Sequence, residues 1–127
     1  TSERQAGRPA EIDDGGFADA VVRIMVALAH AGTGTRRRSL AAYGGLAGRD
    51  VRLTDIHGPT LSEMIKKQSG IMKSAPEAAL SALTGLLPCR ADRQKALAIA
   101  SALMVNAPDA DAQVIRMRDA IAAVMGI

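Results

Sequence analysis

The densest cluster of functional groups in the sequence is a run of three arginines, Arg36, Arg37 and Arg38. It follows residues 32–35, Gly-Thr-Gly-Thr, a loop whose backbone amides and hydroxyls can face an anion. Three guanidinium groups beside such a loop suit a phosphate, a polyanion or an acidic protein partner. No P-loop lysine follows, and a basic loop between two helices explains the same residues without a ligand. Both interpretations stay open, and the three arginines are the candidate anion- or partner-binding residues.

A second polar group lies near the C-terminus, where Asp109 and Asp111 follow Asn106. Carboxylate and amide oxygens are the ligands that hard cations such as calcium prefer, but a closed site needs about six of them. Capping of the next helix by Asp109 and compensation of its dipole by Asp111 explain both carboxylates without a metal. We therefore expect no cofactor, and keep a divalent cation at Asp109 and Asp111 as the alternative.

The sequence shows no catalytic constellation. Nucleophilic catalysis needs a serine or cysteine beside a base and an orienting acid. His30 ends an apolar segment, His57 lies in a loop, and Cys89 follows a leucine-rich stretch. The nucleophile elbow, the Walker A loop and the dinucleotide fingerprint are all missing. We expect no catalytic residues and no enzymatic activity from this chain alone.

Composition limits the class of protein. With 48% hydrophobic, 23% charged and only 2% aromatic residues in 127, the chain fits a globular, alanine-rich helical protein rather than a sheet. Its single cysteine excludes an intrachain disulfide and suits the cytoplasm. No apolar run is long enough to span a membrane, and no signal peptide is recognisable. Because the chain begins at Thr1 rather than Met, we expect a piece of a longer protein.

Helical periodicity defines the elements that must position these groups. Phe17, Val21 and Leu28 lie on one face of the first helix, and Asp19 and Arg23 form an i, i+4 pair on the opposite side. Ser74 and Glu77 form a capping box ahead of a later helix. The predicted helices span about 17–31, 38–43, 60–72, 76–87, 92–105 and 110–125.

Residues 96–105 are apolar at every position except Ser101. A helix that is apolar all round must be covered all round, and at about 15 Å this segment is too short to cross a bilayer. The sequence therefore predicts an all-α fold, a compact bundle of about five to six antiparallel helices around a central buried helix at about 92–105. Residues 1–15 read as a flexible linker or arm, and residues 16–127 as a single helical domain.

Four segments of the chain form a pattern that is familiar from other proteins. They are Gly-Phe-Ala-Asp-Ala-Val-Val-Arg-Ile-Met at 16–25, Leu-Leu-Pro at 86–88, Asp-Arg-Gln-Lys-Ala-Leu at 92–97 and Arg-Met-Arg-Asp-Ala at 116–120. Together they resemble the tellurite-resistance B-like helical domain, more particularly the C-terminal region of bacterial poly(3-hydroxyalkanoate) synthase- or depolymerase-like proteins. The resemblance covers residues 16–127 and implies a helical bundle that follows an α/β-hydrolase portion.

The resemblance also implies two acidic turns, which in the tellurite-resistance family bind metal. In this chain the second turn keeps Asp109 and Asp111, but Gln113 stands where an acid is expected. The first turn, residues 31–38, has no acid and carries three arginines, which would repel a divalent cation. The chain thus departs from the family in the residues that would hold the ion.

Two hypotheses about function follow. The first is a non-catalytic accessory or interaction domain of a polyhydroxyalkanoate-related hydrolase-fold protein, cytoplasmic, whose partner is another protein, the parent hydrolase-fold domain or an anionic ligand at Arg36, Arg37 and Arg38. The alternative is a metal-binding stress-response domain of the tellurite-resistance B type that uses Asp109 and Asp111. The sequence leaves a homo-oligomer open in either case.

Overall fold

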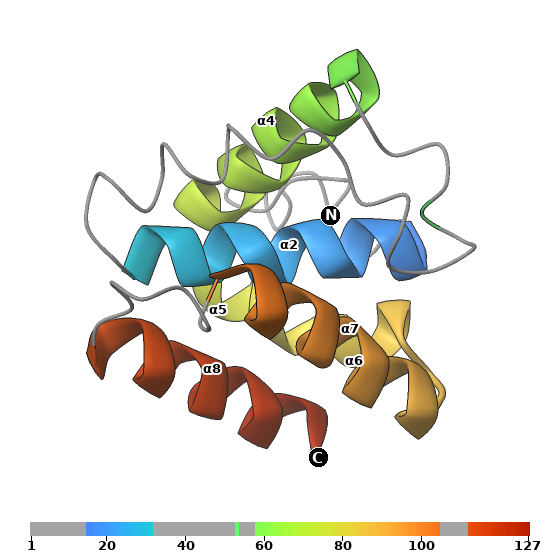
Figure 1. The fold of residues 1–127 in the computed structure, drawn as a ribbon, viewed down its shortest axis with the longest axis vertical. Helices are drawn as coiled ribbons and strands as arrows, with labels where there is room; N and C mark the ends of the chain where they lie inside the picture. Colours follow the sequence, from blue (N-terminus) through green and yellow to red (C-terminus); the bar gives the residue numbers. More distant parts are fainter. Residues whose placement is uncertain (1–14, 32–52, 54–57, 105–111) are drawn as a thin grey trace, which may run out of the picture.

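The computed structural model describes residues 15–31, 53, 58–104 and 112–127, and these are almost entirely helical (Figure 1). No strand occurs among them, so the predicted all-α fold is confirmed. The predicted short helix at 38–43 and all of the predicted N-terminal arm except Gly15 lie outside the described residues. The described helices are α2 (Phe17–Ala31), α4 (Gly58–Ser74), α5 (Pro76–Ser81), α6 (Leu83–Leu86), α7 (Arg90–Met104) and α8 (Ala112–Met125).

Helix α2 occupies the centre of the bundle. It contacts α4, α6, α7 and α8, with α4 on one side of it in Figure 1 and α7 and α8 on another. Eleven of its 15 residues are buried, and every residue from 20 to 29 has an exposed fraction of 0%. Valine, isoleucine, methionine and leucine side chains lie on all sides of this helix, so only a position surrounded by other helices can bury them.

The prediction that residues 92–105 form the central helix is wrong, because α7 is an outer helix with one exposed side. Ala96, Ile99 and Ala100 face the core, whereas Ala98 and Ala102 are exposed. Alanine favours helix on any face and exposes little apolar area, so a run rich in alanine does not require burial all round. The larger branched side chains of α2 decide which helix takes the centre.

The chain from α4 to α6 turns with little connecting structure. Helix α4 continues through Ser74, and only Ala75 separates it from α5. Ala75 is the N-cap of α5 and makes no side-chain capping bond, so the predicted capping box of Ser74 and Glu77 is wrong. Pro76 does occupy the start of the helix, where a missing N–H costs nothing. The predicted single helix at 76–87 divides at Ala82 into α5 and α6.

Two arginines in the first turn of α7 hold the C-terminal ends of α6 and α8. Arg93 donates from Nε to the Leu87 carbonyl at 2.6 Å, from Nη1 to the Met125 carbonyl at 3.1 Å and from Nη2 to the Thr84 carbonyl at 3.3 Å. Arg90 donates to the Gly126 carbonyl at 3.2 Å. The last carbonyls of a helix have no partner within the helix and carry partial negative charge, so guanidinium groups suit them. These bonds fix α8 against α7.

Candidate functional site

The residues that the sequence singles out for binding lie outside the part of the chain that the structure describes. This holds for Arg36, Arg37 and Arg38 and for Asp109 and Asp111, so both sites stay predictions. Within the described ranges, no three histidine, cysteine, aspartate or glutamate side chains are placed to hold a metal ion. In the same ranges no helix is both long and apolar enough to span a membrane.

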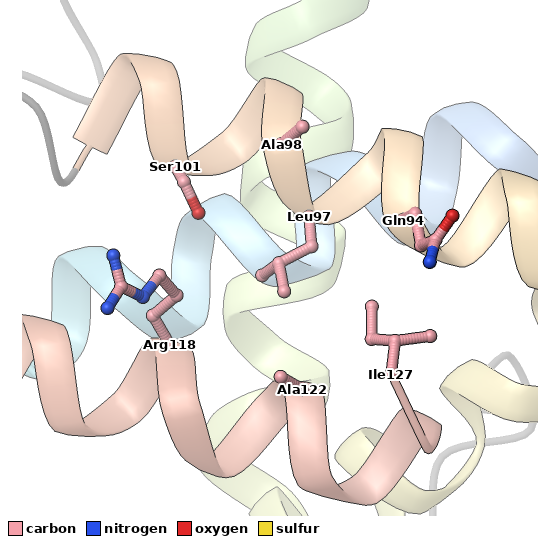
Figure 2. Close-up of a pocket in the computed structure, with 7 residues that line it drawn as sticks. All are labelled: Gln94, Leu97, Ala98, Ser101, Arg118, Ala122 and Ile127. Atoms are coloured by element: carbon pink, nitrogen blue, oxygen red, sulfur yellow. The ribbon is translucent and has the colours of Figure 1, made fainter.

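The described surface carries a groove between α7 and α8, which Figure 2 shows in close-up. Its volume is about 330 Å³, it is open to solvent, and its lining is mainly apolar. Small-molecule pockets begin at about this size, and open apolar grooves also bind amphipathic helices. The lining residues are Gln94, Leu97, Ala98, Ser101, Arg118, Ala122 and Ile127.

The spacing of the lining residues explains why the two helices form a groove. The four residues from α7 stand at i, i+3, i+4 and i+7, which places them on one face of the helix. Helix α8 runs in the opposite direction, so that in Figure 2 Ser101 lies across from Arg118 and Leu97 across from Ala122. Because Ala98, Ser101 and Ala122 are small, the space between the helices is left partly unfilled.

One end of the groove is polar. Ser101 points toward α8 in Figure 2, and its buried hydroxyl has no hydrogen-bond partner among the described residues. A buried hydroxyl without a partner costs about 1–3 kcal/mol. The guanidinium of Arg118 lies at the same end, with 37% of its side chain exposed, and binds the neighbouring Asp119 at 3.2 Å. Arg118 is therefore the polar group that this end of the groove presents to solvent, whereas the Ser101 hydroxyl oxygen is itself buried.

Two large hydrophobic residues of α8, Ile115 and Val124, are exposed among the described residues, at 38% and 40%. Ile115 precedes Arg118 by three residues and Ala122 by seven, so it lies on the groove side of the helix. Val124 lies on the opposite flank by the same geometry. Ile115 thus extends the apolar lining of the groove beyond Arg118, toward the start of α8.

A second polar cluster lies in the interior, where Arg23 of α2 has an exposed fraction of 0%. Its Nε donates to Gln68 of α4 at 2.8 Å and its Nη1 to the Ala79 carbonyl of α5 at 3.0 Å. Gln68 in turn lies 3.5 Å from Asp19, which Lys67 approaches at 4.0 Å. The predicted exposed pair of Asp19 and Arg23 is therefore wrong on the side of Arg23. The cluster joins three helices, and since Arg23 and Gln68 are fully buried, it does not offer a surface to a ligand.

Of the candidate nucleophile and bases, the structure describes Cys89 and His30. Cys89 is exposed between α6 and α7, and His30 is half-buried near the end of α2. His57 lies outside the described residues. The groove itself was not predicted, although its four α7 positions have helical spacing and Ser101 stands out in an apolar run. Comparison of the chain with family models, with curated proteins and with solved structures finds no match.

Proposed function

We propose that the chain is a non-catalytic accessory domain that binds a helix of a protein partner in the groove between α7 and α8. The observation that carries this proposal is the apolar, solvent-open lining that the two antiparallel helices supply. An amphipathic helix that lays its apolar face into such a groove buries surface on both partners. The exposed Ile115 beside the groove adds to the apolar area available.

The nature of the groove supports a helix more than a small ligand. Ala98, Ser101 and Ala122 are small, and small residues allow the backbone of another helix to approach closely. A small apolar molecule in an open groove would leave much of its surface in water and gain little from binding. A partner helix is itself covered by the protein to which it belongs.

The wider setting belongs to the same proposal. The resemblance to the C-terminal region of polyhydroxyalkanoate-related proteins suggests that the partner is the parent hydrolase-fold domain or a protein bound to it. A cytoplasmic location agrees with an exposed free thiol at Cys89, because exposed thiols are kept reduced in that compartment.

The experiment compares two exposed alanines that carry the same substitution. Ala98 lines the groove, whereas Ala120 is exposed on α8 and does not line it. Tagged wild type, Ala98→Arg and Ala120→Arg are used to capture partners from cell extract, and captured proteins are compared by mass spectrometry. We expect partners that wild type and Ala120→Arg share and that Ala98→Arg loses. An identical set for all three proteins contradicts the proposal.

A further inference from the structure

We propose that the groove binds helix α8 of a second copy of this chain, so that two α8 helices pack antiparallel across a two-fold axis. This inference rests on the proposed function, because it names the occupant of the same groove. It is carried by the order of residues on one face of α8 rather than by the groove alone.

Four residues form a stripe along the groove side of α8: Ile115, Arg118, Asp119 and Ala122. Their spacing is i, i+3, i+4 and i+7, so they follow one another along one face. Ile115 is 38% exposed, and the side chains of Arg118 and Asp119 are 37% and 66% exposed. In order, the stripe presents a large apolar side chain, a cation, an anion and a small side chain.

This order is complementary to itself when reversed. In an antiparallel pair whose two-fold axis passes between positions 118 and 119, Arg118 faces Asp119 of the second copy, and Asp119 faces its Arg118. Ile115 then faces Ala122 of the second copy, where the small side chain leaves room for it. A two-fold interface requires that one patch complement a second copy of itself, and this stripe does so in both charge and size.

Arg118 and Asp119 bind each other in the single chain, and each can instead bind the opposite residue of a second copy. Within one chain the two residues are neighbours, and Arg118 binds Asp119 at 3.2 Å from Nη2 and 3.3 Å from Nε. Exposed ion pairs contribute little to stability, so this pair can be broken at little cost. Two ion pairs between copies would replace two weak pairs within copies.

The groove provides the second wall of the contact. A helix packed beside α8 on its groove side meets Leu97, Ala98 and Ser101 of α7. Asp119 of the second copy then arrives at the polar end of the groove, where Arg118 lies. The groove between Gln94 and Ser101 is only about 10 Å long, so the contact is small and association in the micromolar range is expected.

The test reverses the charges at positions 118 and 119. The association constant of each full-length variant is measured by sedimentation equilibrium over a concentration series. Arg118→Asp and Asp119→Arg should each lower the association constant by at least about tenfold, because each places like charges opposite one another. The double variant Arg118→Asp/Asp119→Arg should restore association, since the reversed stripe is again complementary to itself. Glu63→Arg and Lys66→Asp on the exposed side of α4 are the matched controls and should leave association unchanged. Thermal melts verify that each variant is folded.

Disulfide cross-linking tests which residues of the two α8 helices face each other. In a Cys89→Ser background, Ile115→Cys/Ala122→Cys should form disulfide-linked dimers on mild oxidation, because positions 115 and 122 of different copies face each other within disulfide reach. Ile115→Cys alone should not. Equal cross-linking of the single and double variants, or a double charge variant as dissociated as the single ones, overturns the proposed pairing.

The outcomes separate this inference from the proposed function. A wild-type chain that stays monomeric up to the millimolar range overturns the self-association. If Ala98→Arg still loses a partner of different sequence, the groove remains a binding site and only its occupant was wrong. A monomeric chain with no partner that depends on Ala98 overturns both proposals.

Discussion

The guanidinium of Arg93 donates hydrogen bonds to three backbone carbonyls, those of Thr84, Leu87 and Met125. Thr84 lies in α6, Leu87 directly follows that helix, and Met125 is the last residue of α8. Carbonyls in the last turn of a helix have no partner within the helix. We expect Arg93→Ala to lower the free energy of unfolding by about 2 kcal/mol, in spite of the high helix propensity of alanine. Urea unfolding followed by circular dichroism measures this change. Arg116→Ala, at an exposed position of α8, is the control, and an equal loss there would contradict the role of Arg93.

Arg23 and Gln68 are both fully buried and are joined by a hydrogen bond of 2.8 Å. Either Arg23→Met or Gln68→Met removes this bond and leaves one of its two buried polar atoms without the other, and each should cost about 2–3 kcal/mol of unfolding free energy. The double variant removes both groups, so its cost should be clearly less than the sum of the two single costs. Urea unfolding of wild type, the two single variants and the double variant gives the four free energies of this double-mutant cycle. Strictly additive losses would show that the two side chains do not depend on each other.

The burial of one of these two residues follows from its spacing in the sequence, and the burial of the other does not. Gln68 stands in the apolar stripe of its helix, and the structure buries it with Leu61 and Met72. Arg23 stands four residues after Asp19, a spacing that is typical of an exposed ion pair. Two of its acceptors are 45 and 56 residues away along the chain, and no local pattern predicts contacts at that distance.

At the scale of elements, local signals succeeded where large side chains defined a face. The bounds predicted for the first helix, 17–31, agree with those of α2. The break at Ala82 was not predicted, because alanine favours helix and the residues on either side of it continue the apolar pattern. The centre of the bundle was assigned to the wrong helix because alanine was counted with leucine and valine as a residue that must be buried.

Two alanines of α7 test which side of this helix is covered. Ala100 has an exposed fraction of 0%, whereas Ala102, two residues later, is exposed. Leucine at position 100 has no room and should lower the free energy of unfolding by about 1–3 kcal/mol, while Ala102→Leu should be close to neutral. Thermal or urea unfolding measures the stability of the two variants, which carry the same substitution at different positions. Equal destabilisation would mean that α7 is enclosed on both sides, as the sequence alone suggested.

At the scale of the whole molecule, the groove shows why a site can escape sequence analysis. Each half of it is visible as helically spaced small residues, but the two halves face each other only because α7 and α8 pack antiparallel. Arg93 helps to set that packing through a bond to Met125, 32 residues further along the chain. The sequence provides the two faces, and the distant contact decides that they meet.

The net charge of the chain is +3. Binding to a polyanion can depend on a local cluster of positive side chains or on the net charge of the whole surface. The predicted site at Arg36, Arg37 and Arg38 requires the local explanation. Replacing the three arginines by alanine lowers the net charge from +3 to 0, and so does replacing Lys66, Lys73 and Arg116, which are exposed and spread over α4 and α8. Retention on a heparin column over a salt gradient compares the two triple variants at equal charge.

We expect the arginine variant to elute at clearly lower salt than the dispersed variant, because three adjacent cations release more counterions from one polyanion than three separated ones. Both variants should melt near the wild-type temperature if the changes are confined to the surface. Elution of the two at the same salt concentration would show that net charge alone determines retention. The arginine run would then be an ordinary basic loop, the interpretation that the sequence left open.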